Sequence, residues 1–596
     1  MGQVVEEKVG HHSYGEDHHD HQADYTQDGS VDIKGRPVLR SKTGRWRACF
    51  FILGYEMFER FAIVGVQANL VLYLTRELHQ GTVTASNSVT NWIGTMWLTP
   101  LLGAYIADSY LGRYWTSVIA SSIYLLGMIL LTLAVSVPAL RPPSCSSQRL
   151  KEENCPKASF FQVGVFYLAL YIIAVGNGGT RSNMSTMGAD QFDVFEPKEK
   201  TQKLSFFNWW MSSILVGVLF SSTFLVYIQD NVGWSLGYGI PTVGLGISVL
   251  VLLLGTPFYR LKLPVGSPLT KMAMVLVATF RKWRVALPVD PKDLYELSLE
   301  EYANSDVKMI RLDHTSSLRF LDKAAVKTGP TSPWMLTPVT QVEETKQMIK
   351  MIPILVVSFI PNTILAQLVT LFIKQGTTLD RRLGSHFQIP PACLIVFVTI
   401  SFLLSLVAYD RLFVPTVRRY TKNPRGITML QRMGIGLVIH VIVMITASLA
   451  ERKRLNAAMS NGTLGKNDTV PLSILILLPQ FAFMGVGDTF MEPSQMEFYY
   501  DQAPESMKSL GSSLFCLSKG VGFFLSSFLL STVAEITKKK NNGHGGWVLD
   551  NLNVSRMDYY YAFLAVLAFL NLILFVVFAK LFVYNADRSS SQKISR

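Results

Sequence analysis

Charged residues are scarce in this sequence, at 16% of its 596 residues, against roughly 25% in soluble domains. Hydrophobic residues make up 49% and gather in blocks of about twenty, long enough to cross roughly 30 Å of hydrocarbon. This distribution excludes a soluble enzyme, a disordered protein and a nucleic-acid-binding module, although the net charge is +13. We expect the positive excess to lie in cytoplasmic loops and the lipid bilayer to be the chain's main partner.

Cysteine is also rare, with five residues, which excludes a disulfide-stabilised scaffold. Cys145 and Cys155 share one short polar loop, and we predict a disulfide between them if that loop faces an oxidising compartment. The sequence contains no metal-ligand spacing, phosphate-binding loop or catalytic triad. We therefore expect no enzymatic activity, no metal and no cofactor.

The apolar blocks predict an all-α membrane protein with twelve transmembrane helices. They cover residues 47–73, 88–107, 115–138, 159–181, 206–228, 234–257, 348–373, 387–409, 427–450, 471–496, 509–533 and 557–583. The longest interruption separates six helices from six. The predicted order is a disordered cytoplasmic tail, a six-helix bundle, a cytoplasmic linker, a second bundle and a second tail: 1–46, 47–257, 258–346, 347–583 and 584–596.

A faint repeat supports two related halves. The second block ends in Asp108-Ser-Tyr-Leu-Gly112-Arg113, and the eighth ends in Asp410-Arg411. An acid and a base at the inner end of the second helix of each half suggest a substrate site between the halves, near mid-membrane.

Lysine and arginine are about twice as frequent in the segments that face the cytoplasm when the N-terminus is placed inside. The sequons at Asn461, Asn467 and Asn553 then fall in outer loops, where we predict glycosylation. In the linker, residues 268–286 pair an apolar face with several basic residues and predict a helix along the inner membrane surface. The alternative there is a solvated basic linker.

Three charges in the first block form a compact cluster. Glu56, Glu59 and Arg60 are three and four positions apart, so they share one helical face. Two carboxylates beside one arginine do not both stay ionised easily, which is the chemistry that a proton-coupled carrier needs. The alternative is a structural ion pair.

Other charges lie in the fourth, tenth and eleventh blocks. We expect Arg181 to pair with Asp488 across the space between the halves, so that protonating Asp488 frees Arg181 to hold an anionic substrate group. Lys519 faces Glu492 or binds an anion, and the alternative is a lysine that snorkels to the interface or lies at a misplaced helix boundary. His440, surrounded by Val and Ile, is interpreted as a packed histidine, with a proton relay as the alternative.

These residues carry a family resemblance. Glu56-Met-Phe-Glu59-Arg60-Phe61 resembles the helix-one motif of proton-dependent oligopeptide transporters, and residues 103–116 resemble that family's first signature. Four further stretches resemble its plant branch, the nitrate/peptide transporter family: Gly188-Ala-Asp-Gln-Phe-Asp193, Arg319-Phe-Leu-Asp-Lys323, Gln431-Arg-Met-Gly434 and Gln502-Ala-Pro-Glu-Ser-Met-Lys508.

The resemblance implies a major facilitator fold and proton symport of nitrate, small peptides or, in some members, hormones and secondary metabolites. It implies that the Glu56, Glu59 and Arg60 motif couples protons. It also implies that Arg181 and Asp488 replace a lysine and a glutamate that pair in the family, and that Asp108, Gly112 and Arg113 form a cytoplasmic gating motif. Thr116 fits a basophilic kinase site or a helix cap.

Departures from the family bear on the substrate. Ile63-Val64 stands in place of two tyrosines, and Leu215 in place of an asparagine, that contact peptide backbones in peptide carriers. Unpaired peptide groups would each cost about 1–3 kcal/mol, which weakens the case for a standard dipeptide pocket. The seventh block offers only Asn362 and Gln367 as polar cavity residues, with no histidine for a dedicated nitrate site.

We therefore predict a proton-coupled symporter that moves small peptides or nitrate by alternating access, with protons as the coupling ion. A hormone or organic-anion carrier of the same family is the alternative, and a non-transporting membrane sensor is the rival of a different class. The oligomeric state stays open. We favour the plasma membrane over the vacuolar membrane, although no sorting signal distinguishes them.

Overall fold

The computed structural model describes most of the chain. It covers residues 25–142 and 158–583 apart from 194, 265, 299, 301–310, 330, 385–386, 422–425 and 541–545. Cys145, Cys155 and the tail 584–596 lie outside the described residues, so their predictions stay predictions.

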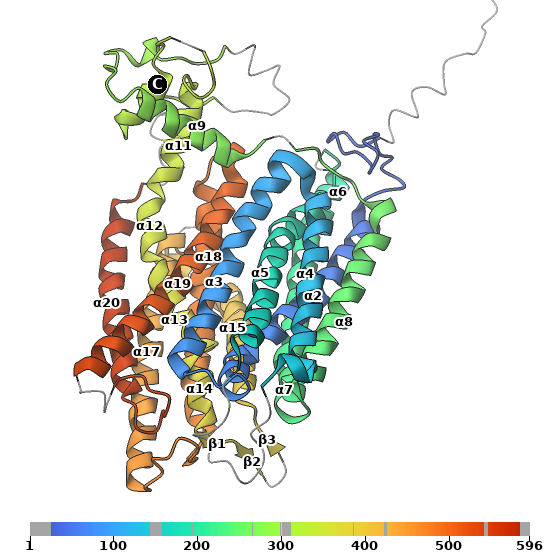
Figure 1. Cartoon of the computed structure of the whole chain (residues 1–596). Coiled ribbons are helices and arrows are strands. Elements are labelled where there is room, and N and C mark those ends of the chain that lie inside the picture. The colour runs from blue at the N-terminus through green and yellow to red at the C-terminus, as the bar shows by residue number, and fades with distance from the viewer. Residues whose placement is uncertain are drawn as a thin grey trace, which may run out of the picture.

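Long helices make up the first half and run side by side (Figure 1). They are α2 (Arg45–Arg76), α3 (Thr82–Ile106), α4 (Gly112–Ser136), α5 (Phe160–Ala189), α6 (Pro197–Phe220) with its extension α7 (Val226–Asn231), and α8 (Trp234–Leu254). Apolar side chains of several of these helices meet in one buried core, which holds Val66, Trp92 and Phe166.

The second half begins with a broken helix and continues with long ones. Its elements are α11 (Val339–Lys350), α12 (Ile352–Val357), α13 (Phe359–Leu368), α14 (Leu371–Thr377), α15 (Ile395–Ala408), α16 (Val414–Thr421), α17 (Met429–Ser460), α18 (Leu478–Gln502), α19 (Lys508–Lys540) and α20 (Met557–Leu581). Four short strands lie at the end of the molecule opposite the linker (Figure 1): β1 (Leu379–Asp380) pairs with β4 (Val470–Ser473), and β2 (Arg382–Leu383) with β3 (Phe387–Gln388).

The helices suit a membrane. Among the described residues, nine helical stretches are long and apolar enough to cross one, and a pair bent by 44°, Val339–Val357 and Phe359–Thr377, is a tenth. One of the nine, Thr82–Ser136, is a continuous stretch that contains both α3 and α4. The all-α membrane architecture is confirmed, while the count of twelve spans stays a prediction.

Matching π-helical turns mark the faint repeat. Ala107–Leu111 follows α3 and Tyr409–Phe413 follows α15, at the places where the sequence repeats an acid and a base. After the first of these turns Gly112 has a φ of 72°, a left-handed conformation that favours glycine, and α4 then begins. The two halves thus share a π-helical turn at corresponding positions.

Prolines inside helices remove a donor and leave the carbonyl four residues earlier without its usual partner. Polar side chains of neighbouring segments reach three such carbonyls, before Pro241, Pro361 and Pro493. Gln229 donates to Gly237 at 3.2 Å, Asn571 to Val357 at 2.9 Å, and Arg432 to Thr489 at 2.8 Å. These three carbonyl oxygens are therefore hydrogen-bonded within the protein, as burial in a membrane requires.

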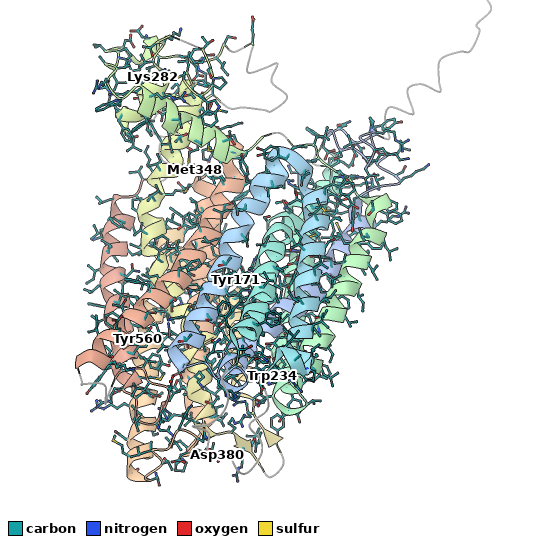
Figure 2. All side chains as sticks on the ribbon, viewed as in Figure 1. Tyr171, Trp234, Lys282, Met348, Asp380 and Tyr560 are labelled. Carbon is teal, nitrogen blue, oxygen red and sulfur yellow. The ribbon has the colours of Figure 1, made fainter. Side chains whose placement is uncertain are left out.

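The linker forms a small unit at the end opposite Asp380, where Figure 2 labels Lys282. Within the predicted amphipathic stretch 268–286, a helix forms over α9 (Pro268–Arg281). It buries Val275 and Ala278 against the linker's own 3₁₀ turn, Arg319–Ala325, and α11. Lys282 is buried rather than on a basic face, it donates to the Val326 carbonyl at 2.6 Å, and burial lowers its pKa. Contact with the membrane surface stays a prediction.

The N-terminal segment departs from the expected disordered tail over residues 25–44. The backbone N–H of Gln27 donates to Asp193 at 3.0 Å, and Arg40 donates to the same carboxylate at 3.1 Å. Arg260, from the start of the linker, is buried and donates to the carbonyl of Thr43 at 2.8 Å. The polar composition of residues 25–44 predicts disorder. The groups that hold this segment in place belong to distant loops, so the segment's own sequence does not reveal them.

Candidate functional site

The charged cluster of α2 is buried and compact. Glu56 and Glu59 are each 2% exposed and Arg60 is 8% exposed. Arg60 Nε donates to Glu56 Oε1 at 2.8 Å and lies 3.3 Å from Glu59 Oε2. The spacing along one helix therefore brings the three groups together, as predicted.

Glu59 links this cluster to α5. Asn177 Nδ2 donates to Glu59 Oε1 at 2.6 Å. The other oxygen, Oε2, is buried and makes no hydrogen bond to any residue that the structure describes, despite its closeness to Arg60. Protonation would give this oxygen a proton to donate. Glu59 is thus a buried carboxyl with one committed and one uncommitted oxygen.

A glycine of α6 makes room for the cluster. A Cβ at Gly217 would lie 2.5 Å from the carbonyl oxygen of Met57 and 2.9 Å from Cβ of Arg60. Any larger residue would push α6 away from α2. Close packing of this kind keeps charged groups out of contact with lipid.

Two cations share one aromatic ring between the halves. The guanidinium carbon of Arg181 lies 3.7 Å from the ring centroid of Trp97, on α3, and Lys519 Nζ lies 4.5 Å from it. Lys519 belongs to α19, which packs along α3 across the boundary between the halves (Figure 1). Such contacts hold a desolvated cation by roughly 2 kcal/mol. Trp97 therefore joins the charges of the two halves.

The expected ion pair between Arg181 and Asp488 is absent from this conformation. Arg181 makes no ion pair with any described residue and contacts Trp97 instead, while Asp488 Oδ1 lies 3.1 Å from Nε2 of His440. In this conformation Asp488 has another partner, because α17 packs on α18 and carries His440 opposite Asp488.

His440 is therefore more than the packed histidine that the sequence favours, because its ring also contacts a carboxylate. It is 1% exposed and both ring nitrogens are hydrogen-bonded. The signal that could have found it is a titratable residue in the middle of an apolar block, four residues after a glycine, Gly436. Lys519 pairs with Glu492 in this conformation, as one of the alternatives predicts.

The predicted cavity residues of the seventh block serve packing. Asn362 Nδ2 donates to the Ser358 carbonyl at 2.8 Å, and Gln367 Nε2 donates to Ser526 Oγ at 3.1 Å. Both side chains are buried at the contact between α13 and α19. Amide side chains often hydrogen-bond between packed membrane helices. From the sequence alone, this role cannot be distinguished from lining a cavity.

Polar contacts between the halves gather at the outer end. Arg381 donates to Asp230 at 3.0 Å, the backbone N–H of Thr82 donates to Asp550 at 2.7 Å, and Asn87 donates to Ser531 at 2.7 Å. With the N-terminus inside, these residues lie at the outer ends of their helices. The structure therefore represents a state in which the outer end is closed.

The predicted gating motif contacts the inner end of α5. Arg113 pairs with Asp190, and the carbonyl of Asp108 accepts from the backbone N–H of Gly266 at 3.0 Å. Thr116 is 5% exposed and donates to the Gly112 carbonyl at 2.8 Å. That contact favours the structural alternative for Thr116 over a kinase site in this conformation.

The sequons differ in exposure. Asn461 and Asn467 are exposed, so glycosylation there stays a prediction. Asn553 is 2% exposed, and its Nδ2 donates to the carbonyls of Gly465 at 2.9 Å and Asp468 at 3.0 Å. The prediction for Asn553 is wrong for this fold because the nitrogen that would carry a glycan is buried and engaged.

One group of described residues has metal-ligand character, contrary to the expectation from sequence spacing. His314, Asp322 and Glu343 of the linker unit have ligand atoms within 4.8 Å of one another. Lys346 Nζ lies 2.6 Å from both carboxylates, so its ammonium already compensates their charge. The group is a buried ion network that needs no metal.

The geometry described above agrees with the comparisons to known proteins. The model of the POT family, PTR2, matches residues 114–548. The chain belongs to the POT family. It is 57% identical to Protein NRT1/PTR FAMILY 5.2 of Arabidopsis thaliana, over 95% of this chain and 97% of that protein. It is 46% identical to Protein NRT1/PTR FAMILY 8.1 of the same plant, over 94% and 98%.

Solved POT-family structures show the same fold. An auto-inhibited POT family peptide transporter superposes with a TM-score of 0.67 at 21% identity, covering 90% of this chain and 98% of that one. The POT family transporter PepTSo gives a TM-score of 0.65 at 20% identity, covering 90% and 98%. The major facilitator fold and the plant nitrate/peptide transporter resemblance are both confirmed, and this POT-family chain is a multi-pass membrane protein of a transporter family.

Proposed function

We propose that the chain is a proton-coupled symporter that moves a small solute, small peptides or nitrate, by alternating access. The observation that carries the proposal is Glu59. It is buried beside Glu56 and Arg60, and one of its oxygens makes no hydrogen bond among the described residues. A carboxyl group buried in a membrane protein is stable only when it is protonated or paired with a cation. Such a group suits a proton-coupling site.

The surroundings of Arg181 support an anionic group on the substrate. Arg181 lies one turn after Asn177, the residue bound to Glu59, and no described carboxylate pairs with it. Arginine stays charged, so its free donors favour a carboxylate or nitrate oxygen. Peptides and nitrate both offer such oxygens, and an organic-anion or hormone carrier is favoured by the same observation.

Transport in oocytes tests the proposal. Full-length protein is expressed, and currents are recorded at about pH 5.5 and about pH 7.5 with nitrate, dipeptides and hormones applied separately. We expect an inward current for at least one solute that is larger at the acid pH, together with accumulation of that solute. Binding without current for every solute at both values would support the membrane sensor instead.

The site of action that we propose is the plasma membrane, with the vacuolar membrane as the alternative. Surface biotinylation in the oocyte and a fluorescent fusion in plant cells distinguish the two.

A further inference from the structure

Both ring nitrogens of His440 have hydrogen-bond partners. Nδ1 lies 2.9 Å from the carbonyl oxygen of Gly436, and Nε2 lies 3.1 Å from Oδ1 of Asp488. A carbonyl oxygen only accepts hydrogen bonds, so Nδ1 must carry a proton. The tautomer of a neutral His440 is thereby assigned.

This assignment determines the proton count of the contact with Asp488. When Nδ1 carries a proton, Nε2 carries one only in the imidazolium form, and a neutral ring presents a lone pair there. The contact therefore contains one proton, either on Nε2 facing a carboxylate or on the carboxyl facing a neutral ring. Without that proton, two acceptors would face each other at 3.1 Å.

Close helix packing prevents the two side chains from relaxing in place. A Cβ on Gly436 would lie 3.1 Å from the carbonyl oxygen of Gly487, and one on Gly487 would lie 3.4 Å from Cε1 of His440. The two glycines let α17 and α18 approach closely. If the proton between Nε2 of His440 and Asp488 is lost, the two acceptors can therefore separate only when a side chain changes its position or a helix shifts.

The charged groups around the pair are few. On α18, Glu492 lies one turn after Asp488 and is paired with Lys519 of α19. On α17, Arg432 reaches the Thr489 carbonyl and Glu451 lies near the outer end; α20 carries Asp558 and Lys580 at its two ends. The α13 and α15 helices contain no acidic, basic or histidine residue.

We propose that His440 is a further proton-binding residue of this carrier, that it shares one exchangeable proton with Asp488, and that release of this proton to water breaks their contact. This proposal rests on the proposed symport and deepens it, because it names a coupling site in the second half. The freed Asp488 carboxylate then becomes available to the cations Lys519 and Arg181. The site is separate from the Glu59 cluster in the first half.

Nuclear magnetic resonance of the full-length protein in lipid nanodiscs tests the pair directly. The histidine rings carry nitrogen-15, and spectra are recorded from about pH 4 to about pH 9. The variant His440→Gln assigns the two resonances. The variant His314→Gln is the matched control, since His314 also contacts an aspartate, Asp322 at 2.9 Å, but lies in the linker unit.

We expect Nδ1 of His440 to stay protonated throughout and Nε2 to change from a hydrogen-bonded to a free nitrogen as pH rises. In Asp488→Asn the amide donates to Nε2 but has no titratable proton, so this change disappears. A proton on Nε2 with none on Nδ1, or an Nε2 resonance that is the same at every pH in the unaltered protein, would overturn the proposal.

The two proposals fail separately. If the resonances change with pH as expected but no solute gives a proton-driven current, the proposal for the His440–Asp488 pair stands and the symport proposal is wrong. A proton-driven current with a proton held on Nε2 keeps the symport and removes the pair.

Discussion

Two groups of buried charges differ in how completely they are hydrogen-bonded. At the outer end, Arg454 and Glu451 are both fully buried and are joined by two hydrogen bonds of 2.8 and 2.6 Å. Arg454 also donates to Asn553 Oδ1 at 2.7 Å and to the Leu552 carbonyl at 2.7 Å. The group around Glu59 instead leaves Glu59 Oε2 and Asn177 Oδ1 without hydrogen bonds among the described residues.

This difference teaches that burial of charge is a weak sign of function by itself. Arg454 belongs to a basic stretch that opposes the expected orientation of the chain, yet it is neutralised by Glu451 and so adds no free positive charge outside. A fully satisfied network resists change, whereas a partly satisfied one can exchange partners. Function is better located by the buried groups that lack partners.

The largest expected effect is on transport, at Glu59. Glu59→Gln keeps the size of the side chain and an acceptor for Asn177 but removes the exchangeable proton. We expect proton-driven accumulation of the transported solute to be abolished while exchange of solute across the membrane persists. The measurement is uptake with and without a pH gradient.

Glu77→Gln, at the outer end of the same helix, is the control and should accumulate solute normally. If Glu59→Gln accumulated solute as well as this control did, the partly satisfied group would not be the coupling site.

The next effect is on stability, at the outer network. Arg454→Met leaves Glu451 buried without its cation, and we expect a loss of about 3–5 kcal/mol. The neighbouring Arg452→Met removes an exposed charge and should change the free energy of unfolding by less than about 0.5 kcal/mol. Thermal unfolding in detergent compares them.

Adding Glu451→Gln to Arg454→Met should recover part of the loss, because no buried charge is then left alone. Equal stability of the two arginine variants would mean that the outer group is not the structural network we describe.

The sequence predicted groups that lie on one helix better than groups assembled from several. Glu56, Glu59 and Arg60 follow from helical spacing alone. His440 and Asp488 are 48 positions apart, and the glycines that bring them together carry no charge signal of their own. Only the packing of α17 on α18 decides that Asp488 faces His440 and not Arg181.

A similar limit explains the other corrections. Asn553 reads as a sequon, but its amide nitrogen is engaged by the carbonyls of Gly465 and Asp468. Residues 25–44 read as a polar tail, but Asp193 and Arg260 supply ionic and hydrogen-bond partners from elsewhere. The helices and the fold class needed only hydropathy, whereas these contacts need the tertiary structure.

A smaller effect is expected at Trp97, which joins the two halves. Trp97→Leu removes the ring that holds Arg181 and Lys519, at a cost of about 0.5–2 kcal/mol. For an anionic substrate we expect the apparent affinity to fall roughly 2- to 30-fold. Concentration dependence of the oocyte current measures it, and Trp115→Leu, which removes an exposed tryptophan of α4, should leave it unchanged.

The smallest effect concerns Asp193, whose buried carboxylate accepts hydrogen bonds from Gln27, Arg40 and Phe195. We call this group the inner clamp, and its carboxylate is fully satisfied, like the outer network. Burial alone would raise its pKa, but backbone N–H groups of Gln27 and Phe195 and the Arg40 guanidinium hold the pKa below its usual value.

A lowered folded-state pKa means that the stabilisation by Asp193 is present above the unfolded pKa of about 3.9 and is lost as pH falls through the folded-state pKa. The protection of backbone N–H groups in residues 25–44 against hydrogen exchange, corrected for the intrinsic pH dependence of amide exchange, should therefore be constant from about pH 7 to about pH 4 and should fall only below that. Asp193→Asn should exchange faster already at neutral pH, because the clamp loses its charge, whereas Asp410→Asn, at an exposed carboxylate of the second half, should not. If this protection instead fell steadily between neutral and mildly acid pH, the inner clamp would belong with the changeable charges around Glu59 and not with the fixed ones around Arg454.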